Sequence, residues 1–92
     1  DLISCNLVFI LCKGLESIII PYGVRTIGED AFYYCEDLMK ITIPNSVDYI
    51  GDFAFSGCDN LVIYCERDRE PDSWKESCWN QDNRPVVWGV KK

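Results

Sequence analysis

The sequence contains no histidine, and it lacks any long apolar run. Without histidine, the Ser-His and Cys-His pairs that activate a nucleophile cannot form. It also lacks a glycine-rich loop of the kind that cradles phosphate groups. The longest apolar stretch, residues 7–12, is far shorter than the roughly 20 residues that cross a bilayer. We therefore expect neither an enzyme nor a protein that inserts into a membrane, and no cofactor.

Basic residues are scarce in the first two-thirds of the chain. Residues 1–65 hold nine acidic side chains against three basic ones, whereas residues 66–92 hold six of each. The net charge of −6 therefore belongs to the first part. Because phosphate backbones and anionic lipids are bound by clustered Lys and Arg, we expect no nucleic-acid partner.

What the sequence does have is an internal tandem repeat. When residues 15–37 are written above residues 38–60, ten of the 23 positions are identical. The identical pairs are Leu15/Leu38, Ile18/Ile41, Ile20/Ile43, Pro21/Pro44, Val24/Val47, Ile27/Ile50, Gly28/Gly51, Ala31/Ala54, Phe32/Phe55 and Cys35/Cys58. Apart from Gly and Pro, all are apolar or thiol side chains, which is typical of coils that stack equivalent residues into one continuous core.

Each repeat predicts a short strand followed by a tight return. Residues 15–20 end in two-residue alternation, the pattern of a strand with one buried face. Gly28 permits a sharp bend, and Asp30 or Asp52 is expected to cap a single helical turn over residues 31–35 or their counterparts. The predicted fold class is α/β, with short parallel strands and tight outer coils.

The pattern L-x-x-I-x-I-P-x-x-V-x-x-I-G-x-x-A-F-x-x-C resembles the BspA-type leucine-rich repeat of many bacterial surface proteins. It covers residues 15–60 closely and residues 9–65 more loosely. The tail, with Trp74, Trp79 and residues 85–89, is similar to the closing segment of such proteins. The resemblance implies a right-handed solenoid with a Trp-rich C-terminal cap, located extracellularly or at a bacterial cell surface.

We expect a single domain over residues 1–92. Its parts are residues 1–14 (a degenerate repeat or the cut edge of a longer array), repeats 15–37 and 38–60, and residues 61–92 (the last strand and the cap). Ser4 and Cys5 stand where the repeat would place Ile and Gly, and the last strand aligns only with a one-residue deletion. Because this N-terminal part is a poor cap, the apolar edge around Phe9, Leu11 and Leu15 predicts self-association.

The six cysteines do not have the spacing of a metal site, which requires C-x-x-C pairs or histidine. Cys12, Cys35 and Cys58 share one repeat position, so we expect a ladder of buried thiols that act as small apolar side chains. Cys65 and Cys78 flank the start of the cap, and sequence alone leaves open whether they form a disulfide.

The three tryptophans allow two interpretations. Rings on a surface can form a carbohydrate platform, but Trp74, Trp79 and Trp88 occur where a stack of coils must end. The last coil of a solenoid needs a bulky cover over its apolar face. We therefore interpret the tryptophans as core covering.

The outward positions of the strands form the predicted binding surface. By the repeat register, the rows are Glu16, Met39 and Val62; Ser17 and Lys40; and Ile19, Thr42 and Tyr64. Exposed apolar clusters tend to mark interaction surfaces, and solenoids bind through their extended strand face. We predict that Tyr64 is the anchor of this surface, unless it is buried beneath the tryptophans.

The sequence thus predicts a non-catalytic protein-interaction or adhesion module of a bacterial cell-surface or secreted protein. Two alternatives remain: a purely structural terminal segment of a longer stalk, or an accessory domain of a larger enzyme. The expected partner is a protein whose identity the residues do not reveal.

Overall fold

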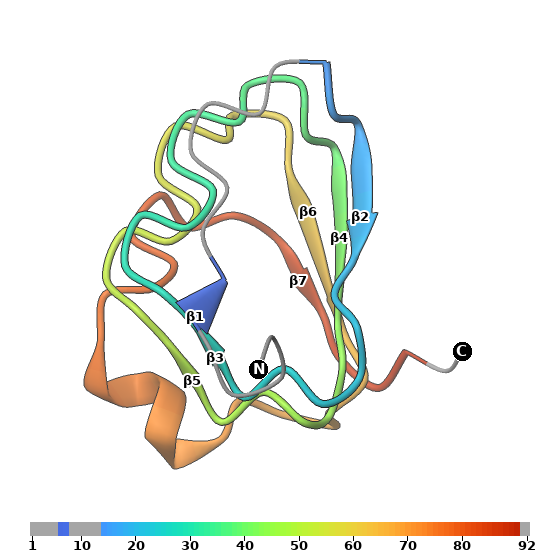
Figure 1. Ribbon diagram of the computed structural model, residues 1–92, viewed down its shortest axis with the longest axis vertical. Helices are drawn as coiled ribbons and strands as arrows, with labels where there is room; N and C mark the ends of the chain where they lie inside the picture. Colours follow the sequence, from blue (N-terminus) through green and yellow to red (C-terminus); the bar gives the residue numbers. More distant parts are fainter. Residues whose placement is uncertain (1–5, 8–13, 91–92) are drawn as a thin grey trace.

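The computed structural model describes residues 6–7 and 14–90, which form short strands and one 3-10 helix arranged as stacked coils (Figure 1). The elements are β1 (Asn6–Leu7), β2 (Ser17–Ile19), β3 (Thr26–Ile27), β4 (Lys40–Ile43), β5 (Tyr49–Ile50), β6 (Val62–Cys65), η1 (Asp72–Glu76) and β7 (Val86–Val87). In Figure 1 the strands β2, β4, β6 and β7 lie on one side of the coils, and β1, β3 and β5 lie on the other.

The larger sheet has the strand order β2-β4-β6-β7, and every pair in it is parallel. Ile18 lies beside Ile41, its counterpart in the next repeat, and Ile41 lies beside Ile63, one position earlier than a full repeat would reach. The expected one-residue deletion before the last repeat strand is therefore confirmed. The inward side chains of the central strands β4 and β6 are buried, whereas Ile18 of β2 and Val86 of β7 are partly buried. Two-residue alternation turns every second residue toward the core.

The smaller sheet has the order β1-β3-β5, also parallel. Ile27 lies beside Ile50, which is again its repeat counterpart, but the backbone partner of Ile27 in β1 is Leu7 and not Ser4. This register agrees with the departure of Ser4 and Cys5 from the repeat pattern, because the spacing from Leu7 to Ile27 is three residues shorter than a full repeat.

Equivalent core side chains lie directly above one another, as the repeat predicts. The rings of Phe32 and Phe55 are stacked, with centroids 5.5 Å apart and planes 10° from parallel. Leu38 and Leu61 are also buried. A chain this short would ordinarily bury only a small core. Stacking of equivalent side chains from successive repeats gives it a continuous one.

The outer turns do not contain the predicted helical turn, so the α/β class was wrong. The described residues contain no α-helix, and the fold is one of short parallel strands. Asp30 and Phe53, equivalent in the two repeats, have φ of 58° and 59°, and Tyr34 and Gly57 have φ of 55° and 82°. A left-handed residue at these positions breaks a helix after one turn, because right-handed φ and ψ must continue from residue to residue.

Gly51 marks a close approach between successive coils. A Cβ atom at this position would lie 2.5 Å from the backbone nitrogen of Glu29. The repeat therefore requires glycine here because two backbones pass each other, in addition to the bend that the sequence suggested.

The tryptophans close the C-terminal end of the stack, as predicted. The ring of Trp79 lies 6.3 Å from that of Phe55, and the ring of Trp74 lies 5.3 Å from Trp79. Trp74 and Trp79 are both buried, whereas Trp88 is partly buried against the core. The aromatic cluster therefore covers the last Phe of the repeat stack.

The cysteines differ from the predicted thiol ladder. Cys35 is disulfide-bonded, whereas Cys58, Cys65 and Cys78 are free. Cys58 does occupy a buried ladder position, where its Sγ donates a hydrogen bond to the Phe32 carbonyl at 3.0 Å. The expected member Cys12 lies outside the described residues.

Cys65 and Cys78 do not form the disulfide that the sequence left open. Cys65 points into the core from the end of β6, whereas Cys78 is exposed beyond η1. Both cysteines are free thiols, one buried and one exposed, and they form no disulfide with each other.

Candidate protein-binding surface

The outward residues of the larger sheet form a surface that we call the strand surface. It consists of the eight predicted residues Glu16, Ser17, Ile19, Met39, Lys40, Thr42, Val62 and Tyr64. One predicted row is present: Ile19 lies beside Thr42, and Thr42 beside Tyr64. Another differs, because Val62 lies beside Lys40 and not beside Met39. The shift follows from the one-residue deletion before β6.

The strand surface contains apolar side chains that are open to solvent. Ile19 is 73% exposed and Met39 is 56% exposed, whereas Thr42, Val62 and Tyr64 are half-buried. Single exposed apolar side chains are ordinary, but apolar side chains that gather in one patch tend to mark an interaction surface.

Part of this surface is hollowed into a depression of about 640 Å³. Its lining residues are Ile19, Lys40, Thr42, Tyr64, Glu66, Val87 and Val90. The structure therefore brings together four of the eight predicted residues here, while the other four lie outside the lining. Its lining combines apolar side chains with two charged ones, Lys40 and Glu66. Small protein interfaces have the same combination of apolar and polar groups.

Sequence reasoning missed the contributions of Glu66, Val87 and Val90. Val87 belongs to β7, which adds a fourth strand to the sheet and places Val87 beside Tyr64. The doublet Val86-Val87 after Pro85 was a signal of a strand, but it has no counterpart in the repeats. Val90 is held at the edge of the same sheet, because its amide donates a hydrogen bond to the Cys65 carbonyl at 2.9 Å.

Tyr64 lines the depression and is partly exposed, so it is not buried beneath the tryptophans. The ammonium of Lys40 lies 5.2 Å from the centre of the Tyr64 ring. A cation over the face of an aromatic ring is attracted by the ring. Tyr64 is thus a partly exposed aromatic side chain in contact with Lys40, at the β6 side of the strand surface.

A larger depression, of about 680 Å³, lies between Asn45 and the residues that lead into η1. Its most buried charged side chain, Arg67, already has partners within the chain. Its guanidinium donates to the carbonyls of Asn45 and Val47 at 2.8 and 3.0 Å and pairs with Asp48 at 3.5 Å. These contacts, all made by one Nη atom of Arg67, join the cap to the last coil, whereas the buried Arg67 Nε has no hydrogen-bond partner among the described residues.

The described residues offer no metal site and no membrane-spanning helix. They contain no group of three or more His, Cys, Asp or Glu side chains able to hold a metal ion. None of the helices in residues 6–7 and 14–90 is long and apolar enough to span a bilayer.

These features define the class of the protein: a short repeat solenoid of parallel strands with an open strand face. The chain belongs to the family described as BspA type leucine rich repeat region (6 copies), whose model matches residues 5–83. Modules of this family are generally protein-interaction domains, typically non-catalytic, and the family is generally surface-associated. Comparison with curated proteins and with solved structures gave no match.

Proposed function

We propose that this chain is a protein-interaction or adhesion module of a bacterial cell-surface or secreted protein, and that it binds its partner through the strand surface. The observation that carries the proposal is the depression around Tyr64, where exposed Ile19 and Val87 lie beside the charges of Lys40 and Glu66. Family membership supports a protein as the partner.

Tyr64 is the expected anchor of this interface. Aromatic residues dominate the binding energy of protein interfaces, and their truncation commonly costs about 2 kcal/mol or more, which is roughly 30-fold in affinity. Ile19 supplies exposed apolar area on the other side of the depression. Both residues extend outward from strands whose inward neighbours form the core, so truncating them leaves the core layers in place.

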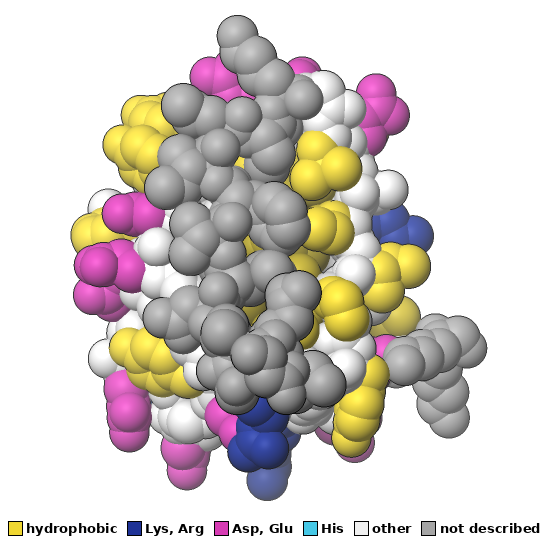
Figure 2. Space-filling model, viewed as in Figure 1, with side chains coloured by type: hydrophobic (Ala, Val, Ile, Leu, Met, Phe, Trp, Pro, Cys, Tyr) yellow, Lys and Arg dark blue, Asp and Glu magenta, His cyan; other side chains and the backbone are white. Residues whose placement is uncertain are grey.

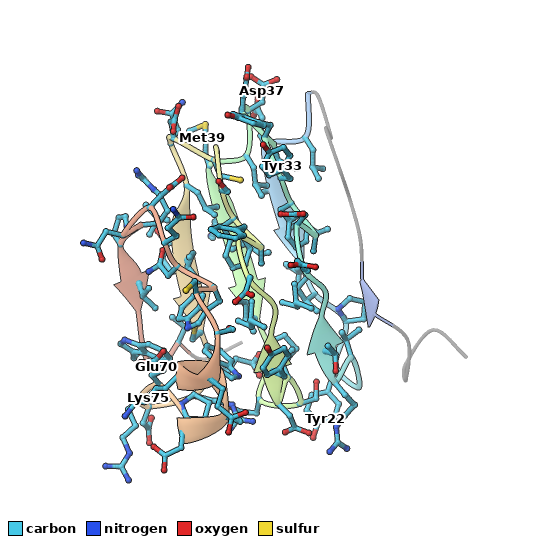
Figure 3. All side chains as sticks on the ribbon, turned by 90° about the vertical axis from the view of Figure 1, so that its left-hand side faces the viewer. Tyr22, Tyr33, Asp37, Met39, Glu70 and Lys75 are labelled. Carbon is cyan, nitrogen blue, oxygen red and sulfur yellow. The ribbon has the colours of Figure 1, made fainter. Side chains whose placement is uncertain are left out.

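The test is a binding screen against a panel of purified extracellular proteins, with Tyr64→Ala and Ile19→Ser as variants. Tyr22→Ala serves as the matched control, because Tyr22 is also an exposed tyrosine but lies on a turn outside the strand surface (Figure 3). We expect at least one panel protein to bind the wild type and the control while losing about 30-fold or more with Tyr64→Ala. If every bound protein tolerates Tyr64→Ala as well as Tyr22→Ala, the strand surface is structural and the proposal is wrong.

A further inference from the structure

A second group of exposed side chains lies on the outer turns, away from the strand surface. The rings of Tyr33, Tyr34 and Phe53 are 37%, 45% and 38% exposed. They belong to two successive turns, residues 28–37 and 51–60, whose coils are joined by backbone hydrogen bonds such as that from the Tyr34 amide to the Ser56 carbonyl at 2.8 Å. We call this group, together with the acidic residues of the two turns, the turn surface. Figure 2 shows apolar and acidic side chains alternating along this side of the molecule.

The turn surface holds its aromatic rings in fixed positions. The rings of Tyr33 and Tyr34 meet edge to face, with centroids 4.4 Å apart. Tyr34 also covers Gly57 so closely that a Cβ there would lie 2.3 Å from a carbon of the Tyr34 ring. An aromatic surface that is ordered before binding loses little conformational entropy when a partner arrives. The rings are therefore ordered before a partner binds, and each is partly exposed in the part of the chain that the structure describes.

The charge around these rings has one sign. Residues 28–37 and 51–60 contain six acidic side chains and no lysine or arginine. These are Glu29, Asp30, Glu36, Asp37, Asp52 and Asp59. Two are occupied, since the Asp37 and Asp52 carboxylates accept backbone N–H bonds from Gly14 and Cys78 at 2.9 and 2.8 Å. The carboxylates of the other four have no hydrogen bond or ion pair within the part of the chain that the structure describes.

One carboxylate lies near the tyrosine pair itself. The charge of Tyr34, followed by burial and by a side-chain hydrogen bond to Tyr34, raises the pKa of the Tyr33 hydroxyl, and the Asp30 carboxylate adds a smaller effect in the same direction. Asp30 and Phe53 occupy equivalent positions in successive coils, so Asp30 of one turn lies beside Phe53 of the next. Exposed aromatic rings and carboxylates thus occur together on the two turns.

We propose that the turn surface binds an arginine-bearing segment of a protein partner, independently of the strand surface. A guanidinium group stacks flat on an aromatic ring and at the same time donates two parallel hydrogen bonds to a carboxylate, whereas the lysine ammonium is a compact and more strongly hydrated charge. The turn surface offers both kinds of acceptor side by side. An anionic or purely apolar partner does not fit, because the unpaired carboxylates would repel the former and be desolvated by the latter.

The test uses a synthetic peptide of alternating arginine and glycine as the probe, with the corresponding lysine peptide for comparison. Binding is measured by calorimetry, and the contact is mapped by amide shifts in ¹H–¹⁵N spectra. We expect the arginine peptide to bind more tightly and to shift the amides of residues 28–37 and 51–60. Tyr33→Ser should weaken binding about two- to fivefold, as expected for loss of one exposed cation–π contact, and Tyr33→Phe should retain it.

The control separates this contact from general attraction to an acidic protein. Tyr22→Ser removes another exposed tyrosine without changing the charge, at the opposite end of the coils from Tyr33 (Figure 3), and should leave binding unchanged. Equal binding of the two peptides, or equal effects of Tyr33→Ser and Tyr22→Ser, would show attraction by net charge only and overturn the proposal. Tyr64→Ala should have no effect on the arginine peptide, so the two interfaces stand or fall separately.

Discussion

The repeat coils and the C-terminal cap solve the same hydrogen-bonding problem by different means. Inside the stack, the carbonyls of one coil accept backbone N–H groups from the next. The Arg25 carbonyl accepts from the Asp48 amide, and the Ile27 carbonyl accepts from the Gly51 amide, each at 2.8 Å. The next coil thus satisfies the buried polar groups of the previous one automatically, since any residue except proline donates.

The last coil has no further repeat above it, and side chains take over. Asp48 and Ile50 are the counterparts of Arg25 and Ile27, and their carbonyls accept hydrogen bonds from the hydroxyls of Ser73 and Ser77. The Val47 carbonyl accepts the indole N–H of Trp74 at 3.2 Å. Helix η1 therefore lies over β5 in the place of a strand. The comparison shows that a cap needs donors at the right spacing and a bulky apolar cover, but no repeat sequence.

The largest expected effect comes from the residue that joins the two regions. Phe55 stacks on Phe32 of the previous repeat and meets Trp79 of the cap. Phe55→Ala should lower the free energy of unfolding by about 3–5 kcal/mol, as a large-to-small change in a core. Urea unfolding followed by tryptophan fluorescence measures it. Phe53→Ala, at an exposed position two residues earlier, should change it by about 0.5 kcal/mol or little more; equal losses at both positions would contradict the assigned register.

The second effect tests the cap alone. Ser77→Ala leaves the Ile50 carbonyl without its donor, and Ser73→Ala does the same to the Asp48 carbonyl. Each substitution should cost about 1 kcal/mol, the usual net contribution of a hydrogen bond, because both bonds are only partly buried. Ser17→Ala is the control, because Ser17 is exposed on β2 and should stay within about 0.5 kcal/mol. Serine changes in the cap that cost no more than this control would mean that the cap works by apolar cover only.

A third prediction concerns the pH dependence of stability, which is expected to come from the two buried free thiols, Cys58 and Cys65. Burial raises the pKa of the Cys58 thiol to about 11 and that of the Cys65 thiol to about 12. Their unfolded value is about 8.5, so the stability that these neutral thiols contribute is fully present below that pH and is lost as the pH rises from there through 11 and 12. Unfolding measured at pH 8 and pH 10 should show this decline, and it should be smaller in Cys58→Ala.

Chemical labelling measures directly how the buried thiols of Cys58 and Cys65 differ in reactivity from the exposed thiol of Cys78. Only the thiolate attacks a disulfide reagent, so Cys58 and Cys65 should remain unlabelled in the native protein at pH 8, while exposed Cys78 reacts. Peptide mapping after labelling distinguishes the three. Labelling of Cys65 as fast as that of Cys78 would mean that the cap opens readily.

The sequence predicted the repeats better than it predicted the cap. The stacking of Phe32 on Phe55 and the deletion before β6 were predictable, because two aligned copies identify the inward positions. The left-handed turns were not, since Asp30 and Phe53 share a backbone conformation but no side-chain chemistry. A helical turn fits the same apolar spacing, so periodicity alone could not distinguish the two.

The cap was only partly predictable because it occurs once. The tryptophans predicted an apolar cover. Nothing in the sequence marks Ser73 and Ser77 as hydrogen-bond donors to β5 and the residue before it, or Val87 as a neighbour of Tyr64. Half of the predicted strand surface therefore lines the depression, and the residues that complete it come from the segment without a repeat. Self-association through Phe9 and Leu11 stays a prediction, because both lie outside the described residues.

The central claim is that successive coils, and finally the cap, are joined in one register. Amide hydrogen exchange in the native protein tests it most directly, because each junction uses particular donors. Slow exchange is expected at the amides that donate between coils, and also at Phe53, whose amide donates to the Cys78 carbonyl of the cap at 3.1 Å. Such inter-coil donors include the amides of Ile20, Phe32, Tyr34, Asp48 and Gly51. Fast exchange at these amides in a folded protein would contradict the stacked register on which both proposed surfaces depend.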